Sequence, residues 1–468
     1  MFTQLLLFLI ATTLTLADDP VFEDSRELCS KKCVCELSKD NSTLYINCES
    51  KLMKHTIANW PDHPSHLMAT FKNNTIVTLE KVPGSDAEDL KLTYSHCKIK
   101  YIATGLLGSA INTKYLDLSH NEIESEQLSA DVFKGPYNNT SYEPIKLEHL
   151  DLSYNRIHSL QKNVFIHTPH LKYLSLEGNR MRIIDHVTCL ALAKVPKMQF
   201  LNLANNKFTE IPGDALKHFP NLTEINLAVN ELDFVPEALG YAAESLQLLN
   251  VSNNPIIEFE QRTFEGLERI LKLFANNLEQ ITVIRAEAFS PLKSLRTLQL
   301  SHCHKLDEID EDAFKNLQHL EEVYINDDNL KTMSPKLLPW NDLRIVDVRN
   351  NQFICNCDLF QISMLLPSFL KTGVNVPLCT DQRTLLSIEI GMMTNETCSY
   401  RSSRREIITY NNFRLMRITM VSLVFMLIIS AMLATWLGYT KWKSYRRTLS
   451  YPFPNQIVYS PVSSSYKH

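Results

Sequence analysis

Cysteine is the residue type whose spacing points most clearly to chemistry in this chain. The sequence contains 11 cysteines, and eight of them form two groups. These are Cys29, Cys33, Cys35 and Cys48, and then Cys355, Cys357, Cys379 and Cys398. Thiols at this spacing either form disulfides, as in secreted proteins, or bind zinc. Because no pair of histidines follows either group at zinc-finger spacing, we expect disulfides, although the sequence alone permits several pairings.

His302, Cys303 and His304 are adjacent in the sequence, and imidazole and thiolate are ligands that zinc prefers. In the repeat register set out below, however, Cys303 points into the core, whereas His302 lies at the edge of a strand face. The three side chains therefore do not converge, and we expect no metal site. The sequence also lacks the GxSxG, P-loop and HExxH motifs, so we predict that the protein is not an enzyme and needs no cofactor.

Seven asparagines begin the N-glycosylation pattern N-x-S/T. They are Asn41, Asn73, Asn138, Asn139, Asn221, Asn250 and Asn395. All of them, and all the cysteines, precede a charge-free apolar run at residues 418–440, and about 20 such residues cross a bilayer. Basic residues from Lys441 to Arg447 follow this run and indicate a cytoplasmic flank. An apolar N-terminal segment, residues 1–17, ends in small residues and predicts a cleaved signal peptide. We therefore expect a single-pass type I glycoprotein of the plasma membrane, with its N-terminus outside the cell.

The pattern L-x-x-L-x-L-x-x-N-x-L recurs from about residue 90 to residue 353. Its clearest copies begin at Leu147, Leu171, Met198, Leu222, Leu246 and Leu343. The alternating leucines point into the core from a strand of period two, and the asparagine turns the chain and can bond the neighbouring coil. One coil cannot bury its apolar face alone, so stacked coils make a continuous core. Most steps are 23 to 25 residues long, which predicts about eleven repeats within residues 88–353.

The ninth position of the repeat carries the residue that connects one coil to the next. It is held by Cys97, Asn121, Asn155, Asn179, Asn206, Asn230, Asn254, Leu278, Cys303, Asp328 and Asn351. Cys97 and Cys303 lie eight coils apart at about 4.8 Å per coil, which is far more than the ~7 Å limit of a disulfide. We expect both to be buried thiols, and Cys189, on a convex segment, to be a structural thiol too. Matching offsets predict an aromatic spine behind the strands, formed by Phe133, Phe165, Phe264, Phe289 and Phe314.

The repeats and the two cysteine groups resemble the extracellular leucine-rich-repeat family seen in Slit, Toll and Trk-type ectodomains. The resemblance implies an α/β-type solenoid, a horseshoe with a parallel concave sheet between two disulfide caps, followed here by one transmembrane helix and by no Toll-type, kinase or immunoglobulin domain. It implies caps at residues 18–87 and 354–400 and a stem at residues 401–417. It also implies the pairings Cys29–Cys35, Cys33–Cys48, Cys355–Cys379 and Cys357–Cys398.

The concave face is the surface on which we expect a ligand. Its outward aromatic and apolar residues are Tyr115, Tyr154, Tyr173, Phe200, Leu248, Phe274 and Tyr324. Aromatic side chains on a rigid sheet are favoured at binding hot spots, although strands also favour them for β-propensity. Phe200, Leu248 and Phe274 are expected to form one contiguous apolar patch. A glycan on Asn250 would stand on this same face, so a flank or the insertion at residues 134–144 is an alternative site.

The C-terminal residues suggest two further contacts. Ser430, Ala434 and Gly438 recur every four residues and predict a face for lateral helix pairing, hence a dimer. In the tail at residues 441–468, Tyr459 and Val462 match a YxxΦ sorting pattern. The net charge of −5 argues against nucleic-acid binding. We predict a recognition or adhesion receptor for protein ligands. Two alternatives are an accessory subunit acting in cis on a membrane channel or receptor, and an innate-immune or decoy receptor.

Overall fold

A computed structural model describes residues 28–366, 376–382, 384–395, 398, 423, 426–427 and 429–443. The chain divides into two units, Met1–Thr397 and Cys398–His468. Most of the described residues belong to the first unit.

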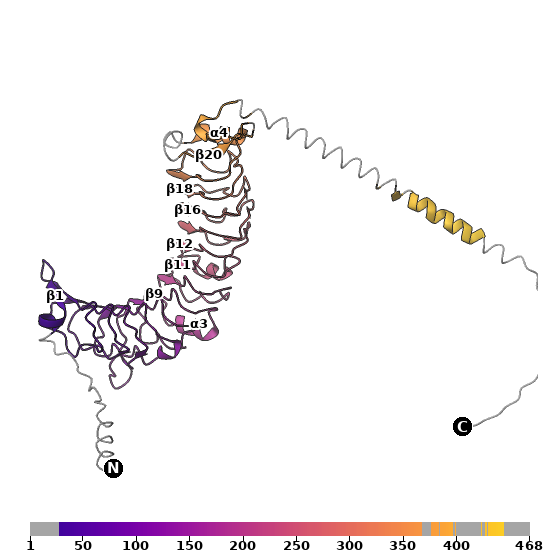
Figure 1. Ribbon diagram of the computed structural model, residues 1–468. Coiled ribbons are helices and arrows are strands. Elements are labelled where there is room, and N and C mark those ends of the chain that lie inside the picture. Colours follow the sequence, from indigo (N-terminus) through magenta and orange to yellow (C-terminus); the bar gives the residue numbers. More distant parts are fainter. Residues whose placement is uncertain are drawn as a thin grey trace, which may run out of the picture. The chain divides into compact units, whose positions relative to one another are not determined.

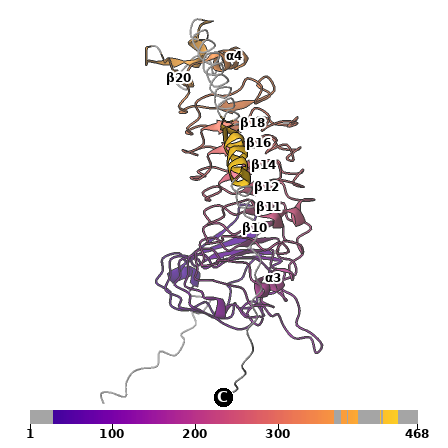
Figure 2. The same ribbon diagram turned by 90° about the vertical axis from the view of Figure 1, so that its right-hand side faces the viewer.

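One long sheet runs through the first unit (Figure 1). Among the described residues it has 14 strands, of which the first, β1 (Val34–Leu37), is antiparallel to the second. The other thirteen are parallel and stack in chain order, as Figure 2 shows for β10 to β18. They are β2 (Thr43–Asn47), β3 (His66–Thr70), β5 (Asp89–Thr93), β7 (Thr113–Asp117), β8 (His149–Asp151), β9 (Tyr173–Ser175), β10 (Phe200–Asn202), β11 (Glu224–Asn226), β12 (Leu248–Asn250), β14 (Lys272–Phe274), β16 (Thr297–Gln299), β18 (Glu322–Tyr324) and β19 (Ile345–Asp347). This arrangement confirms the predicted parallel-sheet solenoid.

Each coil buries the apolar positions of the repeat. In the coil that begins at Leu147, this residue and Leu150, Leu152 and Ile157 are fully buried. The strand of this coil, β8, is three residues long, and its one inward side chain is flanked by two outward ones. The predicted phenylalanines behind the strands are all buried, and the rings of Phe289 and Phe314 stack with centroids 4.9 Å apart. The continuous core therefore arises by stacking identical apolar faces.

The parallel sheet begins earlier than the predicted repeat boundary at residue 88. Strands β2 and β3 already pair in parallel register, and β3 leads to a ninth-position asparagine, Asn74, which accepts the N–H of Met53 at 2.9 Å. Ala69 and Phe71 fill the core positions that leucine occupies elsewhere. A pattern based on leucine therefore does not predict this coil. The solenoid has about 13 turns rather than the predicted number of about eleven.

The ninth-position asparagines form a buried ladder of hydrogen bonds. Asn155 is typical, because its Nδ2 donates to the carbonyl oxygens of Leu118 and Leu152 at 3.0 Å while its Oδ1 accepts the N–H of Ile123. This side chain thus satisfies backbone groups of two coils at the point where the strand ends. Among the eleven predicted repeats, four lack the asparagine, and three of these are consecutive. The four residues are Cys97, Leu278, Cys303 and Asp328.

Disulfide-bonded caps close the two ends of the stack. Cys29 pairs with Cys35, Cys33 with Cys48, and Cys355 with Cys379, in agreement with the pairings that the resemblance implied. Cys357 and Cys398 are disulfide-bonded as well. In the N-terminal cap a short π-helical segment, η1 (Leu28–Lys32), precedes β1. The C-terminal cap contains α4 (Cys357–Leu365) and the antiparallel pair β20 (Leu378–Thr380) and β21 (Ser387–Glu389).

Short elements complete the convex side and the C-terminal cap. The only other α-helix in the described part of the first unit is α3 (His186–Leu192), which carries half-buried Cys189. Insertion residues Tyr137 and Tyr142 form an antiparallel bridge and pack ring to ring at 5.2 Å. The remaining elements are β4 (Thr78–Leu79), β6 (Tyr101–Ile102), β13 (Glu258–Phe259), β15 (Val283–Ile284), β17 (Glu308–Ile309) and the 3₁₀ turns η2 (Ser125–Gln127), η3 (Glu237–Ala242) and η5 (Ile390–Met392).

In the second unit, residues 429–443 are helical. Ser430, Ala434 and Gly438 lie within this helix, and their spacing of four places them on one face. None of the helices in the described part of the chain has the length and apolar character needed to cross a membrane. The run predicted to do so, residues 418–440, lies partly outside the described residues. The signal peptide, the stem and the sorting pattern at Tyr459 and Val462 lie wholly outside them.

Candidate ligand-binding surface

Four rings stack side by side across the concave sheet. They belong to Tyr115, His149, Tyr173 and Phe200, which pair in register on the consecutive strands β7 to β10. Their ring centroids are 4.3, 3.7 and 4.4 Å apart in that order, with interplanar angles of 20° or less. All four are half-buried. We call this set the aromatic row.

The aromatic row follows from a single position of the repeat. Each member stands at the third position, one residue before the inward leucine, so parallel pairing places all four in line. Three of the predicted ligand residues are thereby brought together. His149 was not among the predicted ligand residues. The feature that identifies it is its place in "LEHLDL", which is equivalent to the place of Tyr173 in "LKYLSL".

A second stack runs beside the aromatic row along the turns that follow the strands. His96, His120 and Tyr154 stack with centroids 4.1 and 4.3 Å apart. All three occupy the eighth repeat position in the left-handed conformation, with φ between 53° and 56°. In the next coil this position is Gly178, and its lack of a side chain leaves space for the Tyr154 ring. Tyr154 is therefore a predicted ligand residue that lies on the edge of the concave face rather than on a strand.

The predicted apolar patch of Phe200, Leu248 and Phe274 is not contiguous along the sheet. Glu224 on β11 stands between Phe200 and Leu248 at the third position, and Lys272 follows Leu248. Phe274 stands at the fifth position instead. Register explains the difference, since a shift of two positions along a strand moves a residue into another row. Tyr324 also stands at the fifth position, four strands beyond Asn226.

Carboxylates line the aromatic row at the fifth position. Asp117 and Asp151 pair in register next to Tyr115 and His149, and each accepts the N–H two residues ahead at 2.8 Å. In the next coil the fifth position is Ser175, and Glu177 stands two residues later, where it accepts the Tyr154 hydroxyl at 2.8 Å. Burial raises the pKa of Asp151, and the negative charges of Asp117 and Glu177 raise it further. This part of the concave face is thus negative beside its aromatic rings.

The same burial holds the rings in their neutral forms. It raises the pKa values of Tyr115 and Tyr173 to about 12, with Asp151 contributing to both. It lowers the pKa of His149 to about 4. At physiological pH the aromatic row therefore carries no charge of its own.

Two carboxylates on the flanks differ from Asp117 and Asp151 in having cationic partners. Glu122 pairs with Arg156 at 2.7 Å, and Glu148 pairs with Lys172 at 2.8 Å. In the described part of the chain, neither Asp117 nor Asp151 takes part in an ion pair, and their hydrogen-bond donors are the neutral groups of Ser119 and Ser153.

A groove of about 620 Å³ lies at the N-terminal end of the aromatic row. Val34 and Tyr45, both about half exposed, line it together with Met68, Lys91 and Tyr115. Tyr45, Met68, Lys91 and Tyr115 pair in one register line, so the groove continues directly into the aromatic row. An apolar hollow and a ring surface therefore form one continuous site.

Asn250, the glycosylation asparagine on the concave sheet, lies outside the aromatic row. Asn250 is half-buried on β12, two strands beyond the last ring of the aromatic row, and its Oδ1 accepts the N–H of Ser252 at 3.1 Å. The same bond recurs at Asn202 and Asn226, so this asparagine has a structural reason to be present. The other six are exposed: Asn41, Asn73, Asn138, Asn139, Asn221 and Asn395.

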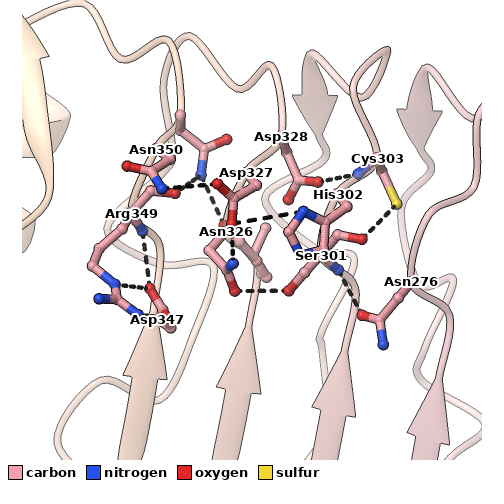
Figure 3. A network of polar contacts seen from close by, with 12 residues as sticks. Asn276, Ser301, His302, Cys303, Asn326, Asp327, Asp328, Asp347, Arg349 and Asn350 are labelled. Atoms are coloured by element: carbon pink, nitrogen blue, oxygen red, sulfur yellow. Dashed lines mark hydrogen bonds and ion pairs between the residues drawn. The ribbon is translucent and has the colours of Figure 1, made fainter.

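His302 and Cys303 lie in a polar network in the C-terminal half of the solenoid (Figure 3). Cys303 is buried, with its Sγ 3.7 Å from the carbonyl oxygen of Ala275, while exposed His302 lies 3.7 Å from Asp327. The side chains thus point to different partners. Asp328 accepts the N–H of Cys303 at 2.6 Å, and burial raises the pKa of this carboxyl to about 8. The network connects coils and presents no convergent ligand set.

Repeats, parallel sheet and paired cysteines together define a leucine-rich-repeat solenoid with disulfide-bonded caps. The family model described as "Leucine rich repeat" matches residues 145–208, 196–256 and 244–304. Tsukushi of Gallus gallus is 26% identical over 260 residues, which cover 52% of this chain and 69% of that protein. Human Toll-like receptor 3 is 26% identical over 227 residues, covering 47% of this chain but 24% of the receptor. These relatives support an extracellular leucine-rich-repeat family.

One similar solved structure has a lower sequence identity. It is the crystal structure of a TLR13–ssRNA13 complex, with 18% sequence identity and a TM-score of 0.42, covering 72% of this chain and 61% of that chain.

Proposed function

We propose that this protein is a membrane-anchored recognition receptor that binds a protein ligand on the N-terminal half of its concave face. The aromatic row carries this proposal, because stacked rings on a rigid sheet offer a large contact area that loses little conformational entropy on binding. The adjoining groove would accept an apolar side chain of the ligand.

The proposed location at the plasma membrane rests on the sequence. The apolar run at residues 418–440, the basic residues after it and the placement of all seven glycosylation sites before it favour a type I orientation. Relatives named as receptors, such as Toll-like receptor 3, agree with this proposal.

A protein ligand is better supported than a nucleic acid. Asp117, Asp151 and Glu177 beside the rings would repel phosphates, which bind to basic surfaces. Half-exposed Val34 and Tyr45 in the groove suit an apolar side chain. An innate-immune or decoy receptor for a protein ligand would use the same surface.

Two substitutions in the aromatic row test the proposal. Full-length protein on cells would first be screened against a panel of secreted and membrane ectodomains. Tyr115→Thr with Tyr173→Thr should then weaken the bound ligand about tenfold or more. Threonine is suitable because Thr297 occupies the equivalent position on β16. Tyr324→Thr, at the other end of the sheet, is the matched control. Loss of binding in the control variant but not in the double variant would refute the site.

A cis-acting accessory subunit is the second candidate. Ser430, Ala434 and Gly438 on one face of the helix at residues 429–443 favour it, because small residues permit close packing between helices. Expression in non-adherent cells separates the two: cell aggregation supports binding in trans, whereas co-purification of one membrane protein without aggregation supports the cis role. If Gly438→Leu leaves co-purification and surface crosslinking unchanged, helix pairing is excluded.

A further inference from the structure

The acidic residues beside the aromatic row have no cationic partner in the described part of the protein. Asp117 accepts the N–H of Ser119, Asp151 accepts hydrogen bonds from Ser153, and Glu177 accepts the Tyr154 hydroxyl and the Asn202 amide. All the donors are neutral. The comparison with Glu148, which has Lys172 at 2.8 Å on the flank, shows that the chain does supply cations to carboxylates elsewhere.

These carboxylates would be stabilised by an external cation. Asp117 and Glu177 lie close enough to Asp151 to raise the pKa of that carboxyl, and all three side chains are half-buried beside rings rather than in open water. A guanidinium or ammonium group over the Tyr115 or Tyr173 ring would gain cation–π attraction in addition to the charge pairing. Neutral His149, which stacks between these rings, adds no opposing charge.

We propose that the ligand contributes an extended polypeptide segment whose arginine or lysine side chain lies over the aromatic row between Asp117, Asp151 and Glu177, while an apolar side chain of the same segment fills the groove beside Tyr45 and Met68. The inference rests on the proposed function and specifies the chemistry of its ligand. Arginine fits better than lysine, because its planar group both stacks on a ring and binds a carboxylate through two N–H groups.

The sheet sets the distance between these two side chains. Met68 on β3 and Asp151 on β8 are three strand steps apart, through β5 and β7. At about 4.8 Å per step and about 3.3 Å per extended residue, this distance corresponds to about four residues. The segment should therefore carry its basic and apolar side chains about four positions apart.

Asparagine at Asp117 and Asp151 removes the charge without removing the structural role. The protein itself places asparagine at the fifth position in Asn202, Asn226 and Asn250, where Oδ1 accepts the same N–H two residues ahead. Asp117→Asn with Asp151→Asn should therefore keep the thermal midpoint of the wild type. Glu279→Gln with Glu308→Gln, two exposed carboxylates at a distance along the solenoid, is the charge-matched control.

Phage displaying random peptides would be selected on cells that carry the full-length protein, after subtraction on parent cells. We expect the enriched peptides to share a basic and an apolar residue about four positions apart. The most enriched peptide would then be synthesised with arginine and with citrulline, which has the same shape and no charge. Both the citrulline peptide and the asparagine double variant should weaken binding about tenfold or more, and the glutamine control should not.

The outcomes separate this inference from the proposed function. Enriched peptides without basic residues, whose binding is lost in Tyr115→Thr with Tyr173→Thr but kept in the asparagine variant, overturn the cationic ligand and leave the binding surface in place. Binding that survives both double variants overturns both proposals.

Discussion

Replacing Asp328 by asparagine is the substitution whose effect the structure defines most fully. The residue is 4% exposed, its Oδ1 accepts the Cys303 N–H, and its Oδ2 has no partner among the described residues. In the next coil, Asn351 uses Nδ2 to donate to the carbonyl oxygens of Ile325 and Val348. An ionised Asp328 places an acceptor where this ladder needs a donor, and asparagine would restore the donor.

The size of the expected change in the free energy of unfolding follows from the proton that Asp328 holds. Burial raises the pKa of this carboxyl from 3.8 to about 8. Each pH unit between the unfolded and folded pKa corresponds to about 1.4 kcal/mol. At pH 7 the unfolded carboxyl is ionised and the folded one keeps its proton, which costs at most about 4 kcal/mol. The effective dielectric constant at buried sites is high enough to reduce such costs, so we take about half of this upper limit. Asp328→Asn should therefore raise the free energy of unfolding at pH 7 by about 2 kcal/mol.

The sign of the pH dependence is fixed by the direction of the pKa. Because the folded pKa of Asp328 is raised, its full contribution to stability is present below the unfolded pKa of 3.8 and is lost as pH rises to about 8. The asparagine variant lacks this titration. Its advantage over the wild type should be smallest at about pH 4 and should grow steadily until about pH 8.

Thermal unfolding of the detergent-solubilised chain, followed by circular dichroism across this pH range, measures the effect. The reciprocal variant Asn230→Asp is the control, because it places a carboxylate in a ladder position where Nδ2 now donates to Leu203 and Leu227. It should lower the unfolding midpoint, and more so at high pH. A midpoint shift for Asp328→Asn that is the same at pH 4 and pH 8, or that is negative at pH 8, would refute the reasoning.

Three further substitutions or measurements test other parts of the structure. Tyr94→Phe should raise the free energy of unfolding by about 1 kcal/mol, since the hydroxyl is fully buried without a partner among the described residues; a lower value would reveal a partner. Gly178→Ala should lower it by about 1 kcal/mol or more, because φ is +65° and the new Cβ would lie 2.5 Å from the Tyr154 ring; the same unfolding assay decides. Maleimide at about pH 8 should leave Cys97 and Cys303 unlabelled in the folded protein, since burial raises their thiol pKa values to about 11 and about 12. Both should react in guanidinium, and rapid labelling before unfolding would contradict their burial.

The sequence predicts the solenoid well because the repeat is read from many copies of one pattern. The coil at Asn74 was missed because alanine and phenylalanine replace its leucines. A single coil can tolerate such exchange, since its neighbours on both sides supply the rest of the core. Asn74 itself, 23 residues before Cys97, was the available indication.

The candidate site was predicted only in part, and the reason is register. Tyr115, Tyr173 and Phe200 were selected for their residue type, and the structure shows that they share the third position with His149. Phe274 was selected by the same criterion but stands two positions later. Whether rings stack depends on their position within the repeat as well as on their chemistry, and listing residues by position rather than by type would have revealed the row. The lack of an ion pair at Asp117 in the described part of the chain could not be predicted, because it depends on which side chains the fold brings within reach.

The three consecutive coils without a ladder asparagine have a mechanical consequence. From Leu278 through Cys303 to Asp328, the side chains cannot supply the full set of backbone bonds that Asn254 and Asn351 supply on either side. A solenoid with such an interruption bends like a beam with one compliant section, so a load applied along it would concentrate its strain there. The rings and carboxylates at Tyr115 to Phe200 lie in the stiff section and would keep their geometry while the section nearer the C-terminal cap flexes.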